Sequence, residues 1–162
     1  MSETTPLTTG APAPAFTLPV TGPSTGGDTL SLADLAPNRV VLFFYPKDDT
    51  SGCTAEAIAF TENLAAFEEA GVKILGISKD TIAKHDKFIA KYDLGMPLLS
   101  DAEGDVCEQF GVWKEKSMYG KTYMGIERST FLIGADGTIE HVWRKVKVPG
   151  HVEDVLSVVK GG

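Results

Sequence analysis

The run of six apolar residues from Val40 to Tyr45 constrains the fold more than any other segment of the chain. It is rich in β-branched and aromatic residues, which is typical of a strand covered on both faces. Pro46 ends the run, and from Thr54 the sequence becomes alanine-rich and periodic, so a helix is predicted directly after the strand. A buried strand followed by a helix is the repeating unit of layered α/β domains.

The same order recurs in the middle of the chain. Residues 72–78 predict a second buried strand, and a helix capped by Asp80 follows and ends before Gly95. A short helix is predicted at residues 105–110. The first helix, which Gly71 ends, carries apolar residues at spacings of three and four, namely Ala57, Phe60, Leu64 and Phe67.

Two hairpins and a final helix complete the pattern. Residues 16–18 and 29–32 flank a turn-rich stretch at 21–28, and residues 129–133 and 139–144 are joined through Ala135-Asp136-Gly137. The last helix has its buried stripe at Val152, Val155, Leu156 and Val159. This order predicts a thioredoxin-like α/β fold, with a central mixed β-sheet flanked by helices. We expect residues 1–14 to form a flexible N-terminal arm and residues 15–162 a single domain.

Composition excludes several classes of function. The net charge of −7 and a pI near 4.9 argue against a nucleic-acid or anionic-membrane surface. No apolar run approaches the roughly 20 residues of a membrane span, and no signal segment opens the chain, so a cytoplasmic protein is expected. His85, His141 and His151 have no metal-like spacing with one another or with either cysteine, so we expect no metal and no bound cofactor.

Cys53 is the candidate nucleophile. Asp48, Asp49, Thr50 and Ser51 supply turn and N-cap chemistry, so the sulfur is expected in the first helical turn or its cap. There the free amide groups and the helix dipole favour a thiolate over a thiol. The alternative is a buried cysteine that acts as a small hydrophobic residue.

The motif around Cys53 is similar to the active-site motif of peroxiredoxins. Pro46-x-x-x-Thr50-x-x-Cys53 carries the core of the resemblance, and the wider run Tyr-Pro-Lys-Asp-Asp-Thr-x-Gly-Cys-Thr-x-Glu resembles the bacterioferritin comigratory protein (PrxQ) class. Residues 124–133, 143–148 and 150–151 also resemble that class in type and order. The resemblance covers residues 14–162 and implies a thiol-dependent peroxidase that reduces hydrogen peroxide and organic hydroperoxides through a Cys53 sulfenic acid.

The resemblance also implies roles for the neighbours of Cys53. Thr50 would hydrogen-bond the peroxide and the thiolate, and Pro46 would shield the pocket from water. Arg128 would favour the thiolate and donate to the peroxide oxygens, with Glu56 holding its guanidinium. The simpler alternatives are a helix cap for Thr50, a strand terminator for Pro46, and for Arg128 a surface ion pair with Glu127 or Glu56.

Cys107 leaves the catalytic cycle open. Many members of the class carry a second cysteine five residues after the reactive one or in the next helix, but here those positions are Ile58 and a stretch without cysteine, Thr81 to Tyr92. Cys107 is therefore a partly buried thiol, a resolving cysteine that needs local unfolding, or a link between subunits. The first case implies a one-cysteine cycle with an external reductant such as thioredoxin, glutaredoxin or another thiol. We expect a monomer, with a dimer as the alternative.

Three other functions fit Cys53 less well. A dithiol oxidoreductase needs Cys-x-x-Cys, where this chain has Thr50 in the first position, and a cysteine hydrolase needs a histidine base in a recognisable motif. A redox-sensing binding or holdase protein would share the first chemical step with a peroxidase. Sustained turnover with a reductant distinguishes the enzyme from the sensor.

Overall fold

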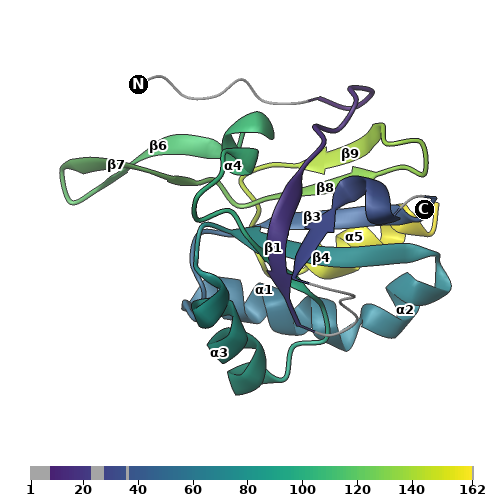
Figure 1. The fold of residues 1–162 in the computed structure, drawn as a ribbon, viewed down its shortest axis with the longest axis horizontal. Coiled ribbons are helices and arrows are strands. Elements are labelled where there is room, and N and C mark those ends of the chain that lie inside the picture. The colour runs from purple at the N-terminus through teal and green to yellow at the C-terminus, as the bar shows by residue number, and fades with distance from the viewer. Residues whose placement is uncertain (1–7, 23–27, 36, 162) are drawn as a thin grey trace.

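The computed structural model describes residues 8–22, 28–35 and 37–161, which form a mixed sheet with helices packed against it (Figure 1). The sheet has the order β2-β1-β5-β4-β3-β8-β9. Its strands are β1 (Thr17–Thr21), β2 (Thr29–Ser31), β3 (Arg39–Phe44), β4 (Val72–Ser78), β5 (Leu98–Ser100), β8 (Ser129–Ile133) and β9 (Ile139–Trp143). The helices are η1 (Leu32–Leu35), α1 (Ser51–Glu62), α2 (Leu64–Glu69), α3 (Ile82–Tyr92), α4 (Val106–Gln109) and α5 (His151–Val159).

The strand directions confirm the mixed sheet and both hairpins. β4 runs parallel to β3 and β5, whereas β8 runs antiparallel to β3 and β9 antiparallel to β8. β1 pairs with β2 in the first hairpin. The carboxyl ends of β3, β4 and β5 therefore meet the amino end of β8 at one edge of the sheet. Residues that follow the three parallel strands, and residues that precede β8, are brought together there.

The core has two parts, one on each face of the sheet. Successive residues of β3 point to opposite faces, so Val41 and Phe43 belong to one cluster and Leu42 and Phe44 to the other. The first cluster is completed by residues of α1, α2, α3 and α5. The second is completed by residues of β1 and α4, including Cys107.

Three details differ from the sequence-based expectation. The predicted helix from residue 54 to Gly71 is divided at Asn63, whose side-chain amide donates to the carbonyl of Ala59 at 2.8 Å and so competes with the helical backbone. The hydroxyl of Thr81, not Asp80, caps α3 by accepting from the amide of Lys84 at 3.3 Å. Strand β5 and the hairpin of β6 (Trp113–Met118) and β7 (Lys121–Ile126) were not predicted.

The β6–β7 hairpin extends away from the main sheet (Figure 1). The expected N-terminal arm falls partly outside the described residues, which begin at residue 8, and so does part of the 21–28 turn, residues 23–27. Backbone hydrogen bonds join the described part of the arm to the start of β9: the amide of Gly10 donates to the carbonyl of Ile139 and that of Ile139 to Ala11.

Candidate active site

Cys53 lies in the first turn of α1, where the chain enters the helix from the carboxyl end of β3. Its side chain is buried in the core cluster that contains Tyr45 and Phe60. The helix begins at Ser51, ahead of the periodic segment from Thr54 that predicted it, and Cys53 lies in its first turn as expected. A thiol at this place faces unpaired helical amides and the positive end of the helix dipole.

Arg128 is brought to Cys53 by the antiparallel pairing of β8 with β3. Ser129, its neighbour, pairs with Phe44, so Arg128 lies beside the loop that follows β3. Its Nη2 lies 3.4 Å from Sγ of Cys53, and its Nη1 donates to Oε1 of Glu56 at 2.8 Å. The guanidinium thus contacts both side chains, and its ion pair with Glu56 is largely buried and not at the surface.

Burial and their mutual contacts set the electrostatics of the trio formed by Cys53, Glu56 and Arg128. Burial opposes the charge of Arg128, but Glu56 and Cys53 outweigh burial and raise the pKa of the guanidinium above its ordinary value. Burial also raises the pKa of Glu56 from 4.5 to about 7, against the opposing effect of Arg128. Arg128 therefore stays charged, while Glu56 sits near the midpoint of its titration at neutral pH.

Glu56 has a second neighbour that the sequence did not indicate. Its Oε2 accepts no hydrogen bond and lies 4.0 Å from Nε2 of His151, which is 2.9 Å from the hydroxyl of Thr130. Burial lowers the pKa of His151 to about 4, so the imidazole is neutral at physiological pH. Among the described residues, the carboxylate is thus held by a hydrogen bond from Arg128.

Thr50 and Pro46 lie in the loop that leads into α1. The hydroxyl of Thr50 donates to the carbonyl of Lys47 at 2.9 Å, and the side chain accepts no capping hydrogen bond. Thr50 occupies the N-cap position, but its hydroxyl does not act as a cap. Pro46 is half-buried and follows β3 after one intervening residue, Tyr45. The roles of Thr50 and Pro46 toward peroxide stay predictions.

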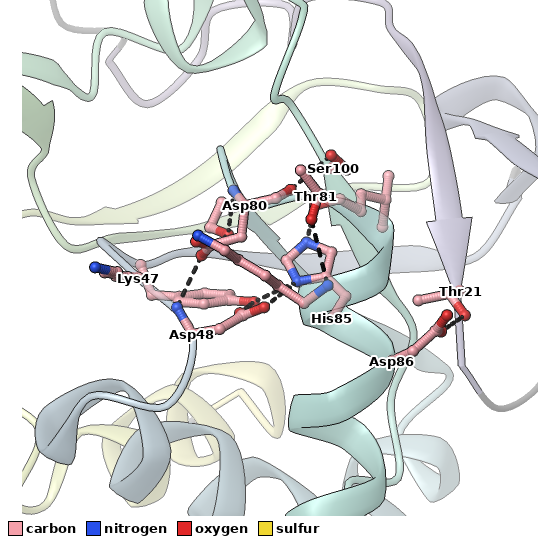
Figure 2. Close-up of polar contacts among 12 residues, drawn as sticks. Thr21, Lys47, Asp48, Asp80, Thr81, His85, Asp86 and Ser100 are labelled. Carbon is pink, nitrogen blue, oxygen red and sulfur yellow. Dashed lines mark hydrogen bonds and ion pairs between the residues drawn. The ribbon is translucent and has the colours of Figure 1, made fainter.

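Two acidic residues between Pro46 and Thr50 tie the loop to α3. Asp48 contacts the buried His85, and Asp49, whose φ of 60° is in the left-handed region, accepts from Lys91 at 2.9 Å and from the hydroxyl of Tyr92 at 2.6 Å (Figure 2 for Asp48 and His85). The sequence indicated these acidic residues only as turn formers. Their partners are about 40 positions away, so spacing gives no signal of them.

Lys116 is a further charged group near Cys53 that the sequence did not indicate. Its pKa is lowered by burial and by the charge of Arg128, whereas Cys53 raises it, which places the amine within the field of the trio. Lys116 belongs to β6, a strand whose alternating charges gave no sign of the fold. Its position could not be read before the hairpin was known.

Cys107 lies on the other face of the sheet. It is fully buried in the cluster formed with β1, and its amide donates to Oδ2 of Asp101 at 2.8 Å. Burial and Asp101 raise the pKa of its thiol well above the ordinary value. Both cysteines are free, and the sheet separates them.

Among the described residues, no group of three or more His, Cys, Asp and Glu side chains is arranged to hold a metal ion. In the same part of the chain, no helix is long and apolar enough to cross a membrane.

Known proteins resemble this chain over most of its length. The family model of the AhpC/TSA family matches residues 9–142. The putative peroxiredoxin Bcp of Coxiella burnetii is 51% identical over 91% of this chain and 95% of its own length, and peroxiredoxin Bcp of Escherichia coli K12 is 46% identical over 96% and 97%. The solved structure of Xanthomonas campestris peroxiredoxin Q is 45% identical, covers 90% of both chains and superposes with a TM-score of 0.83.

The chain belongs to the Bcp/PrxQ class of peroxiredoxins. The resemblance expected from the motif around Cys53 is thereby confirmed, as is the thioredoxin-like fold. As a peroxiredoxin of this class, the protein is a thiol-dependent peroxidase that takes hydroperoxides as substrates and a thiol as reductant.

Proposed function

We propose that this peroxiredoxin reduces hydrogen peroxide and small organic hydroperoxides in the cytoplasm, with Cys53 as the residue that attacks the peroxide. The contact of 3.4 Å between Arg128 and Sγ of Cys53 carries the proposal, because it pairs a buried sulfur with a permanent positive charge at a helix start. A related protein supports the inclusion of organic hydroperoxides among the substrates. The solved structures of Xanthomonas campestris bacterioferritin comigratory protein, which is 44% identical to this chain, concern its alkyl peroxide reduction activity.

The reaction begins with a thiolate at Cys53. The sulfur attacks the terminal oxygen of the hydroperoxide, the O–O bond breaks, and the alkoxide or hydroxide leaves with the bonding electron pair and takes up a proton. Sulfur is oxidised by two electrons to the sulfenic acid, and the peroxide is reduced by two. Arg128 donates to the oxygens on which negative charge develops, and the Thr50 hydroxyl orients the peroxide, shielded by Pro46.

The second half of the cycle uses an external thiol. That thiol attacks the sulfenic acid, water leaves, and a mixed disulfide forms, which a second thiol cleaves to restore Cys53. The opposite-face position of Cys107 supports this one-cysteine cycle, since the sheet lies between the two sulfur atoms. Thioredoxin, glutaredoxin with glutathione, or another dithiol would serve as reductant for a monomeric enzyme.

Two measurements test the proposal. Cys53→Ser should abolish peroxide consumption with a thiol reductant, and residual turnover in that variant would remove Cys53 from the central role. Intact mass after one equivalent of hydrogen peroxide, with and without a sulfenic acid trap, tests the cycle. The same trappable sulfenic acid in wild type and Cys107→Ser supports a one-cysteine cycle; loss of two hydrogens in wild type alone makes Cys107 the resolving residue.

A further inference from the structure

A buried polar network joins the loop before Cys53 to helix α3 (Figure 2). Nδ1 of His85 lies 2.7 Å from Oδ2 of Asp48, and Nε2 of His85 lies 2.9 Å from the carbonyl oxygen of Leu99. The hydroxyl of Tyr45 donates to the other carboxylate oxygen of Asp48 at 2.6 Å. His85 is completely buried, so water does not complete any of these hydrogen bonds.

The partners of the ring fix the number of protons. A carbonyl oxygen can only accept, so Nε2 of His85 carries a proton and donates to Leu99. Nδ1 then faces a carboxylate oxygen at hydrogen-bond distance, and two lone pairs cannot face each other at 2.7 Å in a buried site. One more proton must therefore lie between Nδ1 and Oδ2, shared by the imidazole and the carboxylate.

The groups around His85 and Asp48 are engaged in hydrogen bonds that do not place a proton between Nδ1 and Oδ2. Directly after β3, the pKa of Tyr45 is raised well above its ordinary value, by burial first and then by Asp48, so its hydroxyl stays protonated. That hydroxyl lies 3.5 Å from Nδ1 of His85 but donates to the nearer Oδ1 of Asp48 at 2.6 Å. After β4, Asp80 accepts from the amide of Asp48 at 2.8 Å and from the hydroxyl of Ser78 at 2.7 Å. From β5 the ring meets a backbone carbonyl. The pocket that Asp48 and Asp80 line is also lined by the charged groups Lys47, Asp49, Lys84, Lys87 and Lys91.

We propose that His85 is a positioning residue for the peroxidase reaction: through the single proton that it shares with Asp48, it fixes the loop that places Thr50 and Cys53. This inference rests on the proposed role of Cys53. It adds a requirement beyond the catalytic side chains, namely a proton held between His85 and Asp48, outside the group of Cys53, Glu56 and Arg128.

The loop geometry explains how the effect reaches the site. Asp48 lies midway between Pro46 and Thr50, and its amide and side chain are both held, by Asp80 and His85. Thr50 in turn donates to the carbonyl of Lys47, directly before Asp48. Removal of the shared proton would set a carboxylate against a lone pair, displace Asp48 and move the start of α1, and a displacement of about 1 Å at a reacting group costs up to about 100-fold in rate.

The first test is spectroscopic and needs no peroxide. The chain has only three histidines, so nitrogen-15 labelling of histidine permits direct assignment. We expect one strongly deshielded proton coupled to Nδ1 of His85 in the reduced protein. It should persist in Cys53→Ser and in His141→Gln, and disappear in Asp48→Asn. If no such proton is seen at any pH at which the protein is folded, the proposal is wrong.

The second test compares pH profiles. Asp48→Asn keeps every contact without the extra proton, since its amide oxygen can accept from Tyr45 and its amide nitrogen can donate to a neutral Nδ1. The rate constant for the reaction of reduced Cys53 with hydrogen peroxide is measured for wild type and Asp48→Asn as the pH is raised. The ratio of the variant's rate to that of wild type should rise on the order of tenfold over the range in which the deshielded proton is lost.

A constant ratio across that range would overturn the proposal. His85→Ala should be slower on the order of 10-fold to 100-fold at every pH, and should lack the alkaline decline specific to wild type. If His85→Ala does not fold, the proposal is still tested by the deshielded proton resonance and by the ratio of the Asp48→Asn rate to the wild-type rate. Failure of the peroxidase assignment is distinguishable, because it would leave activity in Cys53→Ser while the deshielded proton remained.

Discussion

Gly52 lies so close to Arg128 that a Cβ atom on the glycine would be 3.0 Å from Nη2 of the guanidinium. This is the nitrogen that contacts Sγ of Cys53. A side chain at position 52 would therefore meet the guanidinium on the side of the reactive sulfur. The absence of a side chain next to Cys53 is part of what brings the charge to the thiol.

Gly52→Ala should separate activity from stability. The methyl group must displace the guanidinium by a few tenths of an ångström, which weakens its contact with Cys53 and should slow the reaction with peroxide about threefold to tenfold. Stability should not fall, because alanine favours a helix over glycine by up to about 1 kcal/mol. Stopped-flow kinetics and urea unfolding measure the two effects. A double-mutant cycle with Arg128→Ala serves as control: equal slowing by Gly52→Ala with and without Arg128 would contradict this explanation.

Thr50→Val should slow the reaction with peroxide about 100-fold, because loss of the hydroxyl that orients the peroxide misplaces a reacting group. Loss of its hydrogen bond to the carbonyl of Lys47 should lower the free energy of unfolding by only about 1 kcal/mol. Thr50→Ser keeps the hydroxyl and is the matched control. A valine variant as fast as wild type would limit Thr50 to its place at the start of α1.

Glu56→Gln should change how stability depends on pH. The pKa of Glu56 is about 7 in the folded protein, against 4.5 ordinarily, so between these values the folded state binds more protons than the unfolded state. Folding stability contributed by this group therefore falls as the pH rises from 4.5 to 7, by roughly 3 kcal/mol in all.

Glutamine does not titrate, so the stability of Glu56→Gln relative to wild type should rise by roughly this amount between about pH 4.5 and pH 8. Urea unfolding at a series of pH values measures the difference. Glu62→Gln, on the exposed part of the same helix, should show no comparable trend. A flat difference for Glu56→Gln would mean that Arg128 keeps the carboxyl ionised throughout.

Cys107 should react with an alkylating reagent only when the protein unfolds. Its side chain is fully buried, and burial raises the pKa of its thiol, so both access and thiolate are lacking. Peptide mass mapping after timed alkylation of Cys53→Ser should show labelling of Cys107 that accelerates with urea. Rapid labelling in native buffer would indicate that the face of the sheet around α4 opens readily.

The sequence was informative where a residue's role follows from its neighbours along the chain. The apolar run at β3, the turn after it and the helix at Ser51 place Cys53, Thr50 and Pro46 without a structure. The contact between Arg128 and Cys53 was expected only from resemblance to a family, since 75 positions separate the two residues. Only the antiparallel register of β8 against β3 explains it physically.

What the sequence did not reveal depends on pairing between distant segments. The β6–β7 hairpin has three consecutive charged residues at 114–116 and no regular alternation of apolar and polar residues, so neither its strands nor the place of Lys116 was apparent. The same holds for the contact of His85 with Asp48, which joins a helix to a loop across 37 positions. The helix predicted from 54 to 71 was too long because a side-chain amide at Asn63 competes with the backbone, a local conflict that periodicity does not show.

The two thiols lie on opposite faces of one continuous sheet, and under a one-cysteine cycle this has a kinetic consequence. An internal partner would quench the sulfenic acid at a rate independent of dilution. Here its fate depends on which molecule arrives first, a reducing thiol or a second peroxide that carries the sulfur on to sulfinic acid. Each of these two reactions has a rate equal to its rate constant times the concentration of the attacking molecule. The rate of reduction divided by the rate of further oxidation sets how many turnovers the enzyme completes before it is inactivated.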